Sequence, residues 1–168
     1  MGEQDGSPPV AGAEPDPLTA NITAANAAAR PFRKPADRAA VEVDAAQLPA
    51  LMTQLRDTPE FAFDLLLDHT AVDWLEEELF ELFYQLYSTR HGHYLMVTVE
   101  VPRANPVVPT VAGVWPIAEW QEREVYDLFG VLYDGHPDLR RLFLEDDWVG
   151  FPLRKDYEDD FMLTEVDS

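Results

Sequence analysis

Residues 79–101 read LFELFYQLYSTRHGHYLMVTVEV, and this stretch decides the fold class of the chain. Residues 94–101 alternate in polarity and are rich in β-branched side chains, so they predict a strand. Residues 79–87 carry apolar groups on both faces, and the polar residues 88–92 supply a turn. We therefore predict a β-hairpin. The apolar spacing over residues 74–87 also fits a helix, so that alternative stays open.

Two other segments have the spacing of amphipathic or aromatic-rich helices. Apolar residues at i, i+3, i+4 and i+7 over residues 48–55 predict a helix that starts near Gln47 and ends at Thr58. A second helix is predicted from 117 to 129, with Gly130 as its stop signal. Short strands are expected in two further places, residues 41–43 and the apolar run 61–69.

The two ends of the chain differ in composition from its centre. Residues 1–40 are rich in Pro and Ala and cannot bury enough apolar surface to offset the entropy of ordering. We expect a tail there that is mostly disordered or ordered only against a partner. Residues 158–168 form an acidic tail. The domain predicted between them spans residues 41–157.

Composition excludes several classes of function. The chain has 168 residues, of which 46% are hydrophobic, enough for one domain with a core. Cysteine is absent, which excludes disulfides, thiolate catalysis and Cys-ligated iron–sulfur or zinc sites in this chain. The net charge of −20 argues against nucleic-acid binding and against adhesion to anionic lipid. No apolar run is long enough to predict a membrane span, so a cytosolic location is the default.

The helix predicted at residues 117–129 mixes charged and aromatic residues instead of sorting them onto separate faces. Some of its charges must then lie against protein, and buried charges persist only when they are paired. The candidate counter-ions lie downstream, in sequence without a clear period: Arg140, Arg141, Arg154 and Lys155. A solvated helix face with ordinary surface ion pairs is the alternative.

No residue pattern predicts catalysis, a metal site or a cofactor site in this chain. His91 and His93 have no third ligand in evidence, so a hairpin turn is the favoured interpretation. His69 is expected to be a hydrogen-bonded histidine at a strand end, and His136 to fix a turn rather than transfer protons. Glu122 and Glu124 are two residues apart on a helix and point away from each other. The sequence contains no phosphate-binding loop and no nucleophile elbow.

Three blocks in fixed order carry a resemblance to a known family. They read EREVYDLFG (122–130), GHPDLRR (135–141) and DWVGFPLRKDY (147–157). Together they closely resemble the thirty-kilodalton subunit family of respiratory complex I, over about three-quarters of the chain. The residues that match the family pattern, and are expected at its interfaces, are Glu122, Arg123, Glu124, Asp127, Gly130, His136, Pro137, Arg140, Arg141, Trp148, Gly150, Pro152, Arg154, Lys155, Asp156 and Tyr157.

The resemblance implies an α+β fold, with a mixed β-sheet packed by helices and an irregular C-terminal extension. It implies a place in the peripheral arm of proton-translocating NADH:quinone oxidoreductase, on the cytoplasmic side of the inner membrane. The expected partner is the large hydrogenase-like subunit of that arm, with other peripheral-arm subunits nearby and membrane contact only through the complex. The chain itself would hold no cofactor, while FMN, iron–sulfur clusters and quinone would belong to partner subunits.

Three alternatives remain open. One is an equivalent subunit of a membrane-bound hydrogenase or formate hydrogenlyase. Another is a ferredoxin-linked photosynthetic complex. The third, from a different class, is a free-standing acidic adaptor.

Overall fold

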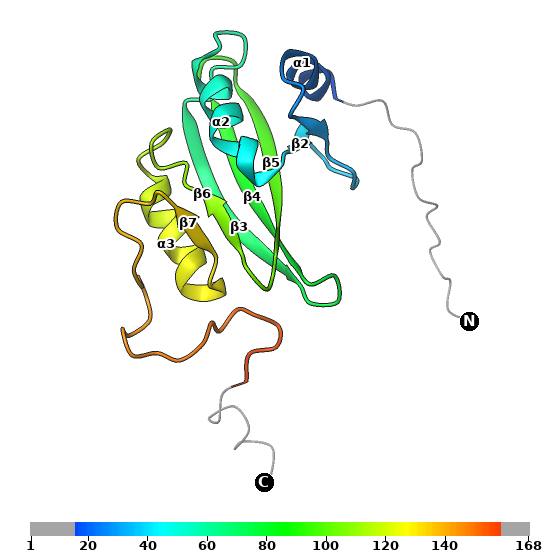
Figure 1. Ribbon diagram of the computed structural model, residues 1–168. Helices are drawn as coiled ribbons and strands as arrows, with labels where there is room; N and C mark the ends of the chain where they lie inside the picture. The colour runs from blue at the N-terminus through cyan, green and yellow to red at the C-terminus, as the bar shows by residue number, and fades with distance from the viewer. Residues whose placement is uncertain (1–15, 159–168) are drawn as a thin grey trace, which may run out of the picture.

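A five-stranded mixed sheet forms the centre of the computed structural model, which describes residues 16–158 (Figure 1). The strand order is β1-β2-β5-β4-β3. Neighbouring strands are antiparallel except β2 and β5, which are parallel. The strands are β1 (Arg30–Pro31), β2 (Ala40–Glu42), β3 (Leu65–Trp74), β4 (Leu79–Ser88) and β5 (His93–Pro102). The predicted α+β class with a mixed sheet is confirmed.

The predicted hairpin is also confirmed, since β4 and β5 pair from Leu79 opposite Pro102 to Ser88 opposite His93. Alternate residues of β4 point to opposite faces of the sheet. The four large apolar or aromatic residues on one face are completely buried: Phe80, Leu82, Tyr84 and Leu86. The helical alternative for residues 74–87 is therefore wrong, because residues 75–78 form the turn between β3 and β4.

The predicted strand at residues 61–69 begins too early. β3 starts at Leu65, because Ala62 adopts a left-handed backbone conformation with φ 45° that interrupts any strand. Phe61 and Phe63 are nevertheless buried. The N–H of Phe63 donates to the carbonyl of Leu55, so this short segment packs on a helix instead of joining the sheet.

Both predicted helices are present and complete the main core. α2 (Leu48–Asp57) follows a single 3₁₀ turn, η1 (Ala45–Gln47), and buries the four apolar residues of its predicted stripe. α3 (Ala118–Phe129) ends at Gly130, whose φ of 77° gives the helix a left-handed cap. The ring of Phe129 meets Phe80 of β4 edge to face, which fixes α3 against the sheet. No helix in residues 16–158 combines the length and hydrophobicity that crossing a membrane demands.

A small second sheet flanks α3. It pairs β6 (Val107–Pro109) with β7 (Leu132–Asp134) in parallel. β6 precedes α3 in the chain and β7 follows it. The pairing of the two strands therefore joins the segment before the helix to the segment after it. This places the segments before and after α3 beside each other.

The tail predicted over residues 1–40 extends too far into the domain. α1 (Pro17–Ala25) is a helix whose Ile22 is completely buried. The hydroxyl of Thr19 accepts the N–H of Ala40, and Asn26 donates to Gln54 of α2 at 2.6 Å. A few buried contacts thus order a segment whose average composition is unfavourable. Residues 1–15 of the predicted N-terminal tail and residues 159–168 of the predicted acidic tail lie outside the described residues.

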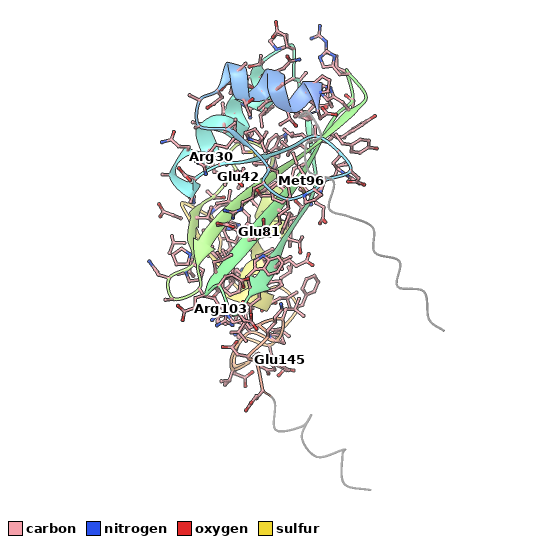
Figure 2. All side chains as sticks on the ribbon, turned by 90° about the vertical axis from the view of Figure 1, so that its right-hand side faces the viewer. Arg30, Glu42, Glu81, Met96, Arg103 and Glu145 are labelled. Carbon is pink, nitrogen blue, oxygen red and sulfur yellow. The ribbon has the colours of Figure 1, made fainter. Side chains whose placement is uncertain are left out.

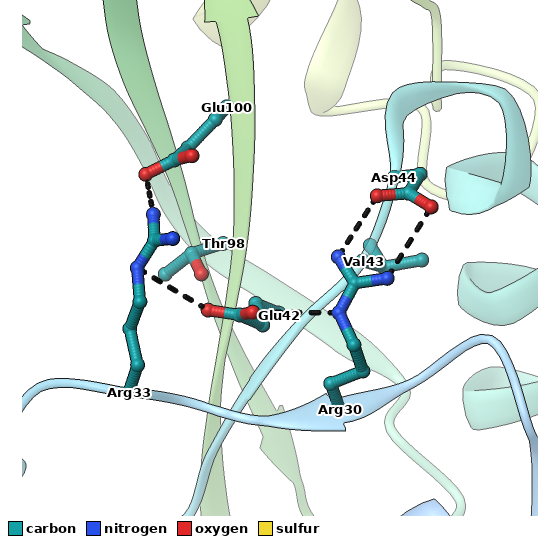
Figure 3. A pocket seen from close by; sticks show the side chains of 7 residues that line it. All are labelled: Arg30, Arg33, Glu42, Val43, Asp44, Thr98 and Glu100. Atoms are coloured by element: carbon teal, nitrogen blue, oxygen red, sulfur yellow. Dashed lines mark hydrogen bonds and ion pairs between the residues drawn. The ribbon is translucent and has the colours of Figure 1, made fainter. Parts of the chain in front are cut away.

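Ion pairs attach the segment after α1 to the sheet (Figure 3). Arg30 donates to both carboxylate oxygens of Asp44, with the shorter contact 2.8 Å, and its Nε lies 3.4 Å from Glu42. Arg33 pairs with Glu100 of β5. Together these side chains line a hollow of about 70 Å³. Because the guanidinium and carboxylate groups satisfy one another, we assign this hollow a structural role.

Candidate docking surface of the C-terminal extension

Residues 135–158 contain no helix or strand, and buried charges hold them in place. The segment leaves β7 and passes beneath α3 in Figure 1. Figure 2 shows Arg103 where the sheet meets this segment and Glu145 farther out. We call residues 135–158 the C-terminal extension.

Asp127 of α3 organises the first half of the extension. Its side chain is fully buried, and one oxygen accepts three consecutive backbone N–H groups, those of Leu142 (3.0 Å), Phe143 (2.7 Å) and Leu144 (3.0 Å). The other oxygen accepts Nη1 of Arg141 at 2.9 Å. Burial alone would raise the pKa of Asp127, but these donors outweigh it and hold the pKa below its usual value.

Two arginines fasten the same loop to α3 through carbonyl groups. Arg141 donates to the carbonyl oxygens of Trp148 (2.9 Å) and Gly150 (3.1 Å), closing residues 141–150 into a compact loop. Arg123 of α3 donates to the carbonyls of Arg140 and Arg141 at 3.1 and 2.9 Å. The backbone of this irregular segment is thus paired largely by side chains.

A second buried carboxylate, Asp73 of β3, holds the far end of the extension. It accepts Nε and Nη2 of Arg103 at 2.6 and 2.9 Å and the backbone N–H of Lys155 at 2.9 Å. Arg103 also pairs with Asp156 at 2.5 Å. Burial on its own would raise the pKa of Asp73, yet the bonds from Arg103 and Lys155 lower it. This arrangement joins β3, the loop after β5 and the extension.

Two glycines allow the extension to approach α3 and fold back on itself. At Gly130 a Cβ would lie 2.6 Å from the ring of Phe151 and 2.7 Å from Arg154. Arg154 donates to the carbonyl of Phe129 at 2.6 Å, and its guanidinium lies over the Phe151 ring. Gly150 also has positive φ, and a Cβ there would lie 2.9 Å from the ring of Tyr157. Larger residues would push these segments apart.

Glu122 is the third buried acid of this region. Its oxygens accept the hydroxyl of Thr110 at 2.5 Å and the N–H of Val111 at 2.7 Å. Burial raises the pKa of Glu122 to about 7 in spite of these bonds. His136 fixes a turn, as predicted: its Nδ1 accepts the N–H of Asp138, and its Nε2 donates to the carbonyl of Glu119.

The other histidines serve the fold. His69 is buried within β3 and not at its end; burial lowers its pKa to about 4, and it contacts the Phe83 carbonyl and the Tyr133 hydroxyl. His91 and His93 each contact a backbone carbonyl of the loop after α2. Over residues 16–158 the structure holds no group of three or more metal-ligating side chains.

The outward side of the extension exposes large apolar groups. Val149 is 86% and Phe143 64% exposed, the two highest values among the exposed large hydrophobic residues of the described chain, and Leu153 is 51% exposed. Between the first two lie the exposed acids 145–147. A hollow of about 270 Å³ opens beside Val149, lined also by Arg154 and by residues 156–158. The surface therefore combines exposed apolar groups with exposed acidic groups, which makes it a candidate docking surface.

The structure brings most of the predicted residues together, with different pairings from those expected. The prediction that α3 carries buried charges is confirmed for Glu122, Arg123 and Asp127, while Glu124 is exposed. Of the four predicted counter-ions, Arg141 alone pairs with a carboxylate of α3 within residues 16–158. Arg140 pairs with the exposed Asp138, Arg154 contacts a carbonyl and aromatic rings, and Lys155 offers its backbone N–H to Asp73.

Three residues of the site were missed from sequence: Asp73, Arg103 and Thr110. Asp73 and Arg103 are 30 residues apart and reach the extension only through the strand pairing. No local pattern marks them.

Comparison with known proteins identifies the family. The family described as respiratory-chain NADH dehydrogenase, 30 Kd subunit, matches residues 41–160. The chain belongs to this family. Its matched region contains α2, α3, most of the main sheet and the extension.

Several relatives at 40% identity or more are C subunits of bacterial NADH-quinone oxidoreductases. The chain is 46% identical to that of Moorella thermoacetica over 125 residues, which cover 74% of this chain and 83% of the relative. With that of Geobacter metallireducens the identity is 52% over 98 residues, 57% of this chain and 60% of the relative. A match to that of Mycolicibacterium smegmatis, at 42% identity, covers 72% of this chain but spans about half of the relative, 52%.

Two solved structures are similar in fold. One is a chain of the membrane-bound sulfane sulfur reductase, an archaeal respiratory membrane complex, with TM-score 0.74 and 29% identity, covering 87% of this chain and 86% of that chain. The other is a trypsin-resistant fragment of Nqo5, with TM-score 0.62 and 29% identity, covering 73% of this chain and 96% of that chain.

Proposed function

We propose that this chain is a docking subunit in the peripheral arm of a proton-translocating NADH:quinone oxidoreductase. Its extension contacts the large hydrogenase-like subunit near the quinone site. In that position it supports electron transfer from NADH to quinone without carrying electrons itself. FMN, iron–sulfur clusters and quinone belong to neighbouring subunits, and the chain contacts the membrane only through the complex, on its cytoplasmic side.

The observation that carries the proposal is the exposed apolar surface of a tightly fastened loop. Asp127, Arg141 and Arg123 fix residues 140–150, yet Phe143 and Val149 point outward. A loop that is ordered before binding loses little entropy when a partner covers it. If the surface faced only solvent, the entropy lost in ordering the loop would not be offset by binding of a partner. We therefore assign Phe143 and Val149 as anchors and the neighbouring hollow at Arg154 as a receptor for a partner side chain.

The same arrangement favours a structural role over a catalytic one. The buried acids Asp127 and Asp73 are fully engaged by donors of their own chain. Glu122 is completely buried on the inner side of α3. The groups with unusual pKa values thus hold segments together and have no access to a substrate.

A second candidate is the equivalent subunit of a related membrane-bound respiratory complex. The likeness in fold to a chain of the sulfane sulfur reductase complex, with TM-score 0.74, supports it. The two candidates share the docking role and differ in the electron donor, which other subunits would bind.

Native affinity purification from the source organism tests the proposal. The expected result is co-purification with flavin- and iron–sulfur-containing subunits and NADH:quinone activity in the isolated complex. A complex with reductase activity but no response to NADH would favour the second candidate. A solitary nineteen-kilodalton species, or quinone reduction by this chain alone, would overturn both.

A further inference from the structure

Glu122 occupies an enclosed position that the docking role does not use. Its carboxylate is completely buried on the inner side of α3. The two donors to it, Thr110 and Val111, come from the segment that follows β6. Within residues 16–158, the basic group in ion-pair range is His136, whose Nε2 lies 3.8 Å from Oε2 and whose side chain is 1% exposed.

The hydrogen bonds of His136 show that it does not offer a full positive charge. Its Nδ1 accepts the N–H of Asp138 at 3.0 Å, and its Nε2–H donates to the Glu119 carbonyl at 3.0 Å. Accepting at one nitrogen and donating at the other is the pattern of the neutral ring. The Nε2–H of His136 thus lies near two acceptors, the Glu119 carbonyl and the Glu122 carboxylate.

The remaining titratable groups around Glu122 are acidic or neutral. They are Glu119 of the same helix, Tyr84 of β4 and Tyr133 of β7. Tyr133 in turn contacts His69 of β3, whose pKa is lowered by burial. Burying an ionised carboxylate with two donors and no cation is costly. Burial accordingly raises the pKa of Glu122 to about 7.

Glu122 can hold a proton without losing its contacts. The hydroxyl of Thr110 donates to Oε2 at 2.5 Å and also accepts the N–H of Ala112 at 3.1 Å. A hydroxyl can exchange the donor and acceptor roles by rotating. A protonated Oε2 can therefore donate to Thr110, while Oε1 continues to accept from Val111. Both protonation states fit the same enclosed site.

We propose that Glu122 binds and releases a proton within its enclosed site and that this exchange is transmitted through His136, 3.8 Å away, to the turn at residues 135–138. When Glu122 is ionised, its charge draws the Nε2–H of His136 away from the Glu119 carbonyl. The ring then moves relative to the N–H of Asp138, which loosens the turn that leads into the extension. The device belongs to the chain itself and does not depend on the docking role.

Amide resonances of the full chain test the proposal across pH 5.5–8.5. Val111 donates to Glu122 and Asp138 donates to His136, so their two amides report the two ends of the device. We expect both to shift with one common midpoint, and Glu122→Gln to abolish both shifts. A Val111 amide that does not titrate over this range would overturn the proposal. An Asp138 shift that survives Glu122→Gln would also overturn it, because the signal at Asp138 would then not originate at Glu122.

A second variant keeps the test valid if Glu122→Gln does not fold. Thr110→Val removes the hydroxyl that stabilises the ionised carboxylate. The expected result is a midpoint for Val111 at higher pH, by about one unit, the size of a lost hydrogen bond to a charged group. A midpoint that does not move would contradict the assignment of the titration to Glu122.

Discussion

Asp127 and Arg141 form an ion pair of 2.9 Å in which the carboxylate is fully buried and the arginine side chain is 13% exposed. The carboxylate oxygen not engaged by Arg141 binds three backbone N–H groups of the loop that Arg141 begins. One helix residue thus fixes both a side chain and the backbone of a segment without secondary structure. The exposed side chains of Phe143 and Val149, which we propose as anchors, owe their position to this contact.

Removing this carboxylate should destabilise the chain. We expect Asp127→Ala to lower the free energy of unfolding by about 3 kcal/mol, because it leaves Arg141 and three N–H groups without their acceptor. Chemical denaturation measures the loss, and limited proteolysis should show new cleavage within residues 140–150. Glu124→Ala, at an exposed position of the same helix, is the control and should change the free energy by less than about 0.5 kcal/mol.

Arg103 should be as important for the other end of the extension. Arg103→Ala leaves the buried Asp73 without its guanidinium, with an expected loss of about 3 kcal/mol. Arg103→Lys should restore only part of it, because an ammonium cannot bind Asp73 through two parallel N–H groups. Thermal unfolding tests the expected order of stability: the unchanged chain first, then Arg103→Lys, then Arg103→Ala. Equal stability of the alanine variant and the unchanged chain would remove Arg103 from the account.

A substitution at Gly130 has two effects, backbone strain and overlap with Phe151, and a comparison with Gly92 separates them. Gly92 and Gly130 both have positive φ, 67° and 77°, but a Cβ at Gly92 would meet nothing within 4 Å. Gly92→Ala should therefore cost about 1 kcal/mol from backbone strain alone. Gly130→Ala adds overlap with Phe151 and should cost about 3 kcal/mol. Equal losses in denaturant unfolding would show that the contact with Phe151 is unimportant.

Glu122 gives the stability of the chain a distinctive dependence on pH. Its pKa rises from 4.5 to about 7 on folding, so its stabilising contribution is complete below pH 4.5 and is lost as the pH rises through 7. The loss amounts to roughly 3 kcal/mol over that interval. We expect the difference in unfolding free energy between the unchanged chain and Glu122→Gln to fall by this amount between pH 4.5 and 7.5. A constant difference would contradict the shifted pKa.

Asp127 should act in the opposite direction. Its pKa lies below 3.8 in the folded chain, so its contribution is present above that pH and is lost as the pH falls through the folded pKa. Asp127→Asn should therefore lose less stability than the unchanged chain when the pH falls from 4 to 2. Acid titrations followed by circular dichroism provide the comparison.

The elements that could be predicted from the sequence are those marked by a local pattern, such as a regular spacing of apolar residues or a glycine stop signal. The hairpin of β4 and β5, the apolar stripe of α2 and the glycine stop of α3 all depend on neighbours within a few residues. The order of α1 was missed because it depends on single contacts across the chain, such as Asn26 with Gln54. Composition averages over a segment and cannot detect such contacts.

The site was predictable only in part for the same reason. Mixed charges on α3 correctly indicated that some are buried. The partner of each charge depends on the path of the extension. That path could not be predicted, because residues 135–158 form no helix or strand and show no periodic pattern of apolar residues. Arg103 therefore took the role expected of Arg154 and Lys155 as a partner for acids, since the strand pairing sets it beside Asp73.

Assembly of a surface variant tests the docking role most directly. Phe143→Asp combined with Val149→Asp places charges where we expect partner contact, and both positions are exposed, so folding of the chain alone should be unchanged. Tyr94→Asp, at a residue 48% exposed on the sheet, is the matched control. Native electrophoresis of the complex should show loss of assembly and of quinone reductase activity for the double variant, with both retained by the control. Full assembly of the double variant would contradict the account.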